Sequence, residues 1–396
     1  MKEYTIAEIL SEPTRNGLTK PKAIRGVGVP MISMREIFAH SRIANVEMDR
    51  VPVTDKELES YSINAGDIVF ARQSLTLAGA GKCSIITKIS EPTVFESHLI
   101  RMRINTEIAD PYYVYYYFNS YEGKNRVKSI VEQVAAAGIR SSDLVKLKIF
   151  LPSKDTQRRI AGFLNKIDTK IETNNEINKN LQDQARTLYH QWLSDTPGIK
   201  QPLSEIADIN PETYSPKNNW LFVNYLDTSS ITEGTINEIQ YIQPMNEKLP
   251  SRARRILRQG DVVFSTVRPN QLHFGIITNP MANMLASTGF AVIRSKKANL
   301  PNEIIYLALT EPAFVDQMQQ LAEQSVSTFP SIRPSDLDAC IVPEPLERDS
   351  DFINTIKSIF AFISANSAEN QQLSELRETL LPKLMSGDLD VSNFDL

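Results

Sequence analysis

Apolar residues recur at spacings of three and four in two long stretches of the chain, one central and one C-terminal. The first stretch covers residues 156–193, which contain no proline and only one glycine, Gly162. The second covers residues 351–386. Steps of three and four place apolar side chains on one face of a helix, as in a coiled-coil seam. The pattern therefore predicts two long helices.

Shorter apolar runs fill the segments that precede each long helix. Residues 68–70 and 262–264 follow Gly-Asp pairs and predict strands, and residues 99–104 alternate in the manner of a strand. Pro111 and Pro301 each precede a helical pattern, where proline suits the first turn. The segments before the long helices are therefore predicted to mix helix and strand.

These elements occur twice, in the same order. The offset between matching segments stays between 193 and 200 residues, which chance does not readily produce. The chain is therefore interpreted as a tandem duplication. The matches are Ile6–Ile9 with Ile206–Ile209, Ala65–Phe70 with Gln259–Phe264, and Ile139–Leu144 with Ile332–Leu337.

The duplication predicts an α+β chain of two mixed α/β domains, each followed by a long helix. The expected parts are residues 1–152, a first helix at 153–196, residues 197–345, and a second helix with its tail at 346–396. About 35 helical residues reach roughly 50 Å, which exceeds the roughly 30 Å diameter of a 150-residue domain. We therefore expect the helices to project and to pair with each other.

Matching asparagines in the two helices suit a role in setting the pairing register, although simple exposure would also explain them. The residues predicted to pair are Ile167, Ile171, Asn174, Asn178, Leu181, Leu188, Ile363, Asn366, Asn370, Leu373 and Leu380.

Composition removes several classes of function. No apolar run is long enough to span a bilayer and the N-terminus lacks a signal-peptide core, which favours a cytoplasmic protein. The four histidines and the two cysteines, Cys83 and Cys340, are scattered outside metal-ligand spacings, so no metal site is predicted. The net charge of −4 is concentrated in residues 349–396 and does not by itself argue for a nucleic-acid partner.

The order domain, helix, domain, helix resembles that of the specificity subunits of type I restriction-modification systems. Short stretches resemble the family as well, although Leu346–Asp349, before the second helix, lacks the glutamine of the first. The stretches are Gly28–Ser33, Gly66–Arg72, Gly260–Thr266, Leu151-Pro152, Gln157–Ala161 and Ile167-Asp168.

The resemblance implies that each globular part is a target recognition domain and that the helices form an antiparallel coiled coil. It implies double-stranded DNA with a bipartite, asymmetric target as the ligand. It also implies two modification (methyltransferase) subunits, which would bring S-adenosylmethionine, and restriction subunits, which would bring ATP and Mg²⁺. The chain itself would hold no cofactor and would not be an enzyme.

Two segments resemble catalytic motifs only in part. Asn210–Thr213 departs from the Asn-Pro-Pro-aromatic motif of DNA methyltransferases, and Gly79–Cys83 lacks the spacing and hydroxyl of a phosphate loop. Two alternatives remain at this stage: a DNA methyltransferase or nuclease with an unrecognised site, and a coiled-coil scaffold that binds no nucleic acid.

The loops after the two Gly-Asp strands carry side chains able to read base edges, because Arg and Lys pair with guanine, Asn and Gln with adenine, and hydroxyls with either. Ordinary solvated loops are the alternative interpretation. The base-reading candidates are Arg72, Gln73, Ser74, Thr76, Thr266, Arg268, Asn270, Gln271 and His273.

Other cations near these loops are candidates for phosphate contacts, which position a protein on DNA without reading its sequence. Simple surface charge is the alternative for each. The candidates are Lys20, Lys22, Arg25, Lys82, Arg140, Arg252, Arg254, Arg255 and Arg333. The aromatic run at residues 112–118 is interpreted as core rather than as a stacking surface for bases.

Overall fold

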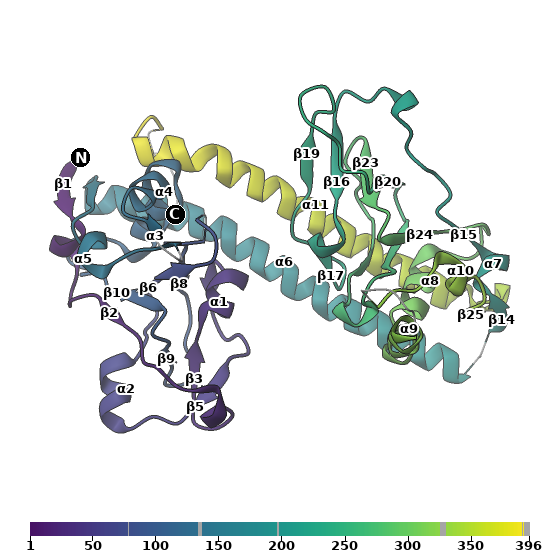
Figure 1. The fold of residues 1–396 in the computed structure, drawn as a ribbon, viewed down its shortest axis with the longest axis horizontal. Helices are drawn as coiled ribbons and strands as arrows, with labels where there is room; N and C mark the ends of the chain where they lie inside the picture. Colours follow the sequence, from purple (N-terminus) through teal and green to yellow (C-terminus); the bar gives the residue numbers. More distant parts are fainter. Residues whose placement is uncertain (78, 134–136, 196–197, 325–329, 390, 392–396) are drawn as a thin grey trace. The chain divides into compact units, whose positions relative to one another are not determined.

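The computed structural model describes residues 1–396 except 78, 134–136, 196–197, 325–329, 390 and 392–396. The expected boundary at 196–197 and part of the acidic tail therefore lie outside the described residues. The chain divides into two compact units (Figure 1). Unit 1 comprises Met1–Ile171 and Gln372–Leu396, and unit 2 comprises Glu172–Gln371.

Unit 1 is built around a five-stranded sheet in which β6 lies between β10 and β8, antiparallel to both. In order, the strands are β2 (Arg15–Asn16), β10 (Leu99–Met102), β6 (Ile68–Ala71), β8 (Cys83–Ile86) and β4 (Arg42–Ile43). The smaller sheets are β5 (Asp49–Val51), β3 (Val29–Ile32) and β9 (Val94–Phe95); β11 (Glu132–Gln133), β12 (Ala137–Gly138) and β7 (Gln73–Ser74); and β1 (Lys2–Thr5) with β13 (Lys148–Leu151). The helices are α1 (Met34–Ala39), α2 (Asp55–Tyr61), α3 (Pro111–Asn119), α4 (Tyr121–Lys128) and α5 (Ser141–Leu144).

Unit 2 repeats this core, with β21 between β24 and β22. Its sheets are β15 (Ala207–Ile209), β24 (Phe290–Ser295), β21 (Val262–Ser265) and β22 (Phe274–Ile276); β19 (Gln240–Ile242), β16 (Val223–Leu226), β23 (Met284–Ser287) and β20 (Ala253–Ile256); β14 (Ile199–Pro202) with β25 (Ile341–Glu344); and β17 (Ile231–Thr232) with β18 (Thr235–Ile236). The helices are α7 (Leu203–Ile206), α8 (Asn302–Leu309), α9 (Pro312–Glu323) and α10 (Pro334–Asp338).

Alternate residues of each central strand enter different cores, because successive strand side chains point to opposite faces. In β6, Ile68 and Phe70 pack with helix α3, whereas Val69 and Ala71 pack on the other face with strands of the smaller sheet. The six residues Tyr113 to Phe118 of α3 are all buried, in agreement with the core interpretation of the aromatic run. In unit 2, Val262 and Val263 divide between two cores in the same way.

A buried ion pair explains the recurring Gly-Asp sequence. Asp67 is 1% exposed and accepts two hydrogen bonds of 2.7 Å from the Arg103 guanidinium. Asp261 is fully buried and accepts bonds of 2.7 and 2.9 Å from Arg294. Each carboxylate also accepts a backbone N–H three residues earlier, at 2.7 Å, and so closes the turn before the central strand. The glycine between has a positive φ, which only glycine adopts at little cost.

The two long helices are α6 (Lys154–Asp195) and α11 (Ser350–Ser386). The Ser153 hydroxyl accepts the Thr156 N–H at 3.2 Å and caps the start of α6. The structure thus confirms the predicted α+β class, with two mixed α/β domains each followed by a long helix.

The long helices contact each other inside each unit, in antiparallel order. In unit 1, Asp168 lies 2.6 Å from Arg377, and Ile160 shares a core with Leu384. In unit 2, polar contacts join Asn174 to Asn370 and Asn178 to Asn366, both at 2.9 Å. Of the residues predicted to pair, Ile167, Asn174 and Ile363 are buried, and Ile171, Asn178, Leu181, Leu188, Asn366, Asn370, Leu373 and Leu380 are half-buried.

The Asp261–Arg294 pair makes a testable contribution to stability. Asp261→Ala leaves Arg294 without its main buried partner, so we expect the free energy of unfolding of unit 2 to fall by about 3–5 kcal/mol. Both tryptophans of the chain, Trp192 and Trp220, lie in unit 2, so tryptophan fluorescence during urea unfolding reports on it.

Asp183→Ala is the control, because its side chain is 60% exposed and lies 4.0 Å from Arg186. It should change the stability of unit 2 by no more than about 0.5 kcal/mol. Equal effects of the two substitutions would show that the buried pair does not stabilise the sheet.

Candidate nucleic-acid interface

The loops chosen from the sequence begin at equivalent backbone positions in the two units. The Arg72 N–H, just after β6, donates to the His98 carbonyl at 2.8 Å, and the Arg72 carbonyl accepts the Ile139 N–H at 2.9 Å. In unit 2, the Thr266 N–H donates to the Gly289 carbonyl at 2.8 Å, and the Thr266 carbonyl accepts the Ile332 N–H at 2.9 Å. The two units therefore share a hydrogen-bonded frame and differ in the side chains mounted on it.

The residue before the strand next to the central strand also has the same backbone pairing and a different side chain in the two units. The residue before the neighbouring strand is Lys82 in unit 1 and His273 in unit 2, and the carbonyl of each accepts an N–H from the last residue of the central strand. Lys82 Nζ donates to the Phe38 carbonyl at 2.9 Å, and burial lowers the pKa of its ammonium group. His273 Nδ1 lies 2.7 Å from the Ile231 carbonyl.

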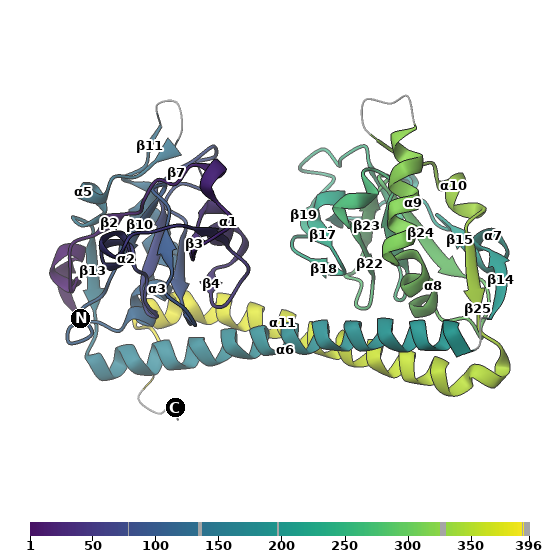
Figure 2. The ribbon, with the colours of Figure 1, turned by 90° about the horizontal axis from the view of Figure 1, so that it is seen from below.

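The loop of unit 1 is fixed by its own hydroxyl groups. Ser74 Oγ accepts the Thr76 N–H at 3.1 Å, and Thr76 Oγ1 accepts the Gly79 N–H at 3.3 Å. Gln73 and Thr76 are exposed, and Arg72 donates from Nη1 to the Ser97 carbonyl at 3.3 Å. Figure 2 shows β7 and β11 at the end of unit 1 away from α6. Residue 78, in this loop, lies outside the described residues.

The loop of unit 2 has an unusual backbone. Arg268 and Leu272 have φ angles of 47° and 58° and flank a short 3-10 helix, Pro269–Gln271. A residue other than glycine is strained in this left-handed conformation and keeps it only where the surrounding structure enforces it. Such residues cluster at functional sites. Arg268 and Asn270 are exposed, as is Gln271. Thr266 is buried instead, and its hydroxyl donates to the Gly289 carbonyl at 2.9 Å, which turns it inward.

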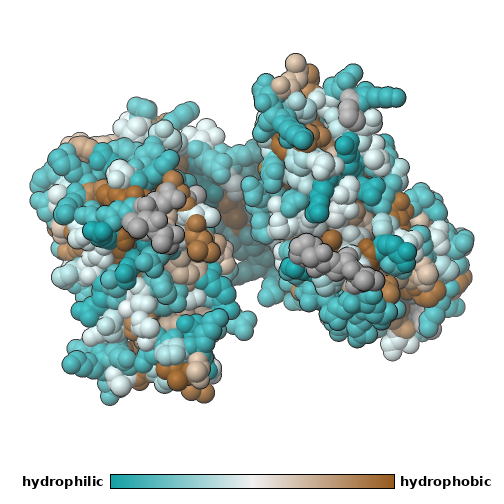
Figure 3. Space-filling model, viewed as in Figure 1, coloured by the Kyte–Doolittle hydropathy of each residue, from teal (hydrophilic) through white to brown (hydrophobic). Residues whose placement is uncertain are grey.

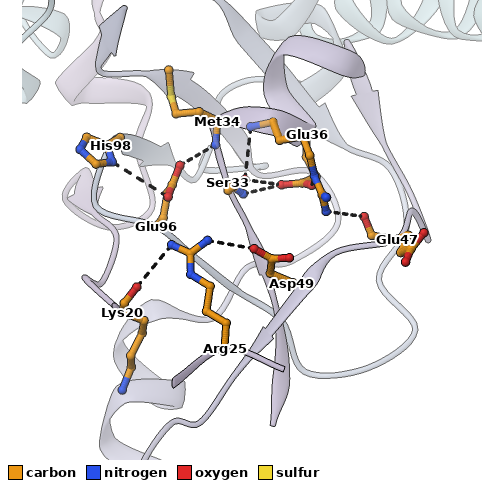
Figure 4. Close-up of polar contacts among 10 residues, drawn as sticks. Lys20, Arg25, Ser33, Met34, Glu36, Glu47, Asp49, Glu96 and His98 are labelled. Carbon is orange, nitrogen blue, oxygen red and sulfur yellow. Dashed lines mark hydrogen bonds and ion pairs between the residues drawn. The ribbon is translucent and has the colours of Figure 1, made fainter. Parts of the chain in front are cut away.

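Several phosphate candidates of unit 1 already have carboxylate partners. Lys20 lies 2.9 Å from Glu57, Arg25 lies 2.9 Å from Asp49, and Arg140 pairs with Glu132 at 2.5 Å. Figure 4 shows Arg25 between Asp49 and the Lys20 carbonyl. Lys22 is exposed. These pairs reduce the positive charge available to a phosphate.

Sequence reasoning missed two residues near the loop that follows β6 in unit 1, His98 and Glu96. Glu96 accepts the Met34 N–H at 2.6 Å and lies 4.0 Å from the Nδ1 atom of His98, whose side chain is 56% exposed (Figure 4). No spacing signal connects His98 with Arg72, because only the pairing of β10 with β6 brings them together.

The arginine-rich strand of unit 2 differs from the cations of unit 1. Arg252 is exposed and Arg254 donates to the Ser251 carbonyl at 3.1 Å. Arg255 has a buried Nε without a hydrogen-bond partner among the described residues, and desolvation lowers the pKa of its guanidinium. Arg333 lies 3.6 Å from Asp336 and remains largely exposed.

Within the described part of the chain, no group of three or more histidine, cysteine, aspartate or glutamate residues could hold a metal ion. Both cysteines are free and buried, and burial raises the pKa of the Cys83 thiol to about 12. The described helices include none that combines the length and the apolar character needed to cross a bilayer. Figure 3 shows a mainly hydrophilic face with small apolar groups on each unit.

Residues 2–183 match the model of the type I restriction modification DNA specificity domain. A Methanocaldococcus jannaschii chain assigned as the MjaX specificity subunit of a type I restriction enzyme is 24% identical, over 96% of this chain and 92% of that protein. The Haemophilus influenzae HindI specificity subunit is 21% identical, over 89% and 91%. Over most of its length, the chain is therefore similar to specificity subunits of type I restriction enzymes. The crystal structure of a type I restriction-modification S subunit from M. genitalium shares the fold, with a TM-score of 0.56 at 15% identity over 97% of this chain and 95% of that one.

Glu212 lies in Asn210–Thr213, the segment compared above with a methyltransferase motif, and it has a structural role. It accepts from Arg294 at 2.5 Å and Arg258 at 2.7 Å, and Glu12 accepts from Arg101 and Arg103 at the equivalent place in unit 1. The hydrogen bond from Arg294, more than any other contact, lowers the pKa of the Glu212 carboxyl.

The lowered pKa predicts a pH dependence. Because the folded pKa is below the unfolded value of about 4.3, the carboxylate stabilises unit 2 above that pH, and the stabilisation is lost as pH falls through the folded pKa. Glu212→Gln should lower stability at pH 6 and flatten its decline between pH 5 and pH 3. Urea unfolding followed by tryptophan fluorescence measures this, with the exposed Glu205→Gln as a control that keeps the wild-type slope. If the stability of Glu212→Gln fell as steeply between pH 5 and pH 3 as that of the wild type, the Glu212 carboxylate would not be the source of this pH dependence.

Proposed function

We propose that this chain is the non-catalytic DNA-reading subunit of its complex and that each unit reads one half of a bipartite, asymmetric target. The observation that carries the proposal is the shared backbone frame with different side chains. Arg72, His98 and Lys82 in unit 1 stand where unit 2 has Thr266, Gly289 and His273. A conserved scaffold with exchanged side chains is what two readers of different sequences require.

Several side chains on the two loops have the chemistry for direct readout in the major groove. Arg72 and Gln73 of unit 1 suit a guanine and an adenine, and so do Arg268 and Gln271 of unit 2. Exposed cations such as Lys22 would contact phosphates and set the position of each unit without selecting bases.

The names of the relatives support assembly with other subunits. We propose that two modification (methyltransferase) subunits per chain bring S-adenosylmethionine and that restriction subunits bring ATP and Mg²⁺. This chain would select the target sequence on double-stranded DNA, in the cytoplasm. The antiparallel contacts between α6 and α11 support a coiled coil that holds the two readers apart.

The division of labour is testable by single substitutions in the complex reconstituted with modification subunits. Arg268→Ala or Gln271→Ala should relax or weaken the second half-site by about 1–3 kcal/mol if the contact is bidentate, and Arg72→Ala should do so for the first. Methylation mapped on a randomised DNA library measures both. Arg348→Ala, an exposed arginine of unit 2 away from the loop, is the control.

Three outcomes would contradict parts of this proposal. If a substitution weakened methylation of unrelated DNA equally, the residue would contact a phosphate. If it did not weaken methylation at all, the residue would be an ordinary solvated loop residue. Incorporation of labelled methyl groups by the chain without its partners would show that it is an enzyme.

The coiled coil should act as a ruler between the half-sites. Four residues inserted in each helix where it passes between units, after Ile171 and after Gln371, add about 6 Å, closest to two base pairs of about 3.4 Å each. The rotation of about 40° beyond a full turn is near the roughly 70° of two base pairs. We expect the spacer to lengthen by one or two base pairs with both half-sites unchanged.

Four residues inserted after Asp195 serve as the control. Tyr189 and Trp192 already pack in the core of unit 2, so an insertion beyond them should leave the spacer unchanged. Methylation of a library of spacer lengths distinguishes the variants. If the paired insertion changed the bases read and kept the spacer, the helices would not be the ruler.

A further inference from the structure

The loop after β6 in unit 1, residues 73–77, and the helix beside it carry exposed apolar side chains. Leu75 is 99% exposed, and the nearby Leu77 and Phe38 are 43% and 41% exposed. A single exposed leucine is ordinary on a protein surface, but here three large apolar side chains accompany one short loop and the helix beneath it.

The loop and α1 are fitted closely to each other. A Cβ atom on Gly79 would lie 2.3 Å from Ser74 Oγ and 3.0 Å from the ring of Phe38, so only glycine permits this approach. Lys82 Nζ lies 5.2 Å from the centre of the same ring. Phe38 therefore packs against the loop, with the Lys82 ammonium over its ring.

Leu75 stands at the turn of this loop, between the two hydroxyl residues that fix it. The Ser74 and Thr76 side chains bond back to the loop backbone and hold the turn, while the Leu75 side chain has no place in any core. Gln73, two residues before, is exposed as well. An apolar group and polar groups are thus presented side by side on a supported turn.

We propose that Leu75 reads a thymine in the first half-site by packing against its C5-methyl group. The inference rests on the proposed function of the loop. In the major groove each base pair shows hydrogen-bonding atoms, and thymine adds a methyl group that only an apolar side chain can select; the minor groove shows no methyl group. Leu75 supplies that apolar surface, and its polar neighbours supply the hydrogen bonds.

Replacement of thymine by deoxyuridine tests the contact, because it removes the methyl group and keeps every hydrogen-bonding atom. The complex with modification subunits is assayed at DNA concentrations below saturation, with each thymine of the target replaced in turn. Burial of one methyl group corresponds to about fourfold, so at one thymine of the first half-site we expect the wild-type methylation rate to fall about fourfold. In Leu75→Ala, the same replacement should change the rate less than about 1.5-fold.

Leu221→Ala is the matched control, because Leu221 is a leucine of unit 2 that is 73% exposed and lies outside the reading loops. It should keep the wild-type response to deoxyuridine. The proposal is overturned if the first half-site contains no thymine, if no replacement slows the wild type, or if Leu75→Ala stays as sensitive as the wild type. Each of these results leaves sequence-specific methylation intact, whereas a complex that methylates without sequence preference would overturn the proposed function itself.

Discussion

A buried carboxylate at the start of the central strand is the constraint on which each unit depends. Asp67 and Asp261 each bind the backbone of the preceding turn and an arginine, which follows strand β10 in unit 1 and lies in strand β24 in unit 2. Removing such a carboxylate leaves a partly buried arginine without its main partner, so stability fixes this residue. The central strand has four residues, about 13 Å at 3.3 Å per residue, and the loop proposed to read bases begins at its other end. The sheet is thus held at one end and leaves the other free to carry different side chains.

The long helices are also held by different side chains at equivalent places in the two units. Tyr116 donates to buried Asp168 at 2.6 Å, and Arg377 completes an ionic cluster between α3, α6 and α11 in unit 1. At the equivalent place in unit 2, Tyr306 packs edge-on against Phe360 at 5.7 Å. Because an ionic cluster and an aromatic pair cannot replace each other without leaving a buried charge unpaired, the difference helps to specify which helix segments pair in each unit.

The fold was accessible from the sequence because periodicity and duplication are local signals. The spacing of apolar residues located both long helices, and the Gly-Asp pairs located both central strands. The partners of the charged residues were not accessible, because they come from distant segments: Asp49 is 24 residues from Arg25, and Glu57 is 37 residues from Lys20. Thr266 follows a strand as Arg72 does, and nothing in its neighbourhood indicated that its hydroxyl turns inward. The base-reading residues themselves stay predictions, since exposure on a suitable loop is necessary for contact and does not establish it.

The distribution of charge bears on how such a chain could favour particular sequences. Its net charge is −4, and Lys20, Arg25 and Arg140 form ion pairs with carboxylates within unit 1. Attraction to phosphates is the part of binding energy that does not depend on sequence, and it grows with the number of cations that displace counterions. Each lysine or arginine paired in this way contributes less to the binding of unrelated DNA, so a larger share of the chain's own affinity would come from base edges. Under the proposed function, the non-specific hold on DNA would then come from the partner subunits, and the discrimination between sequences from the two loops.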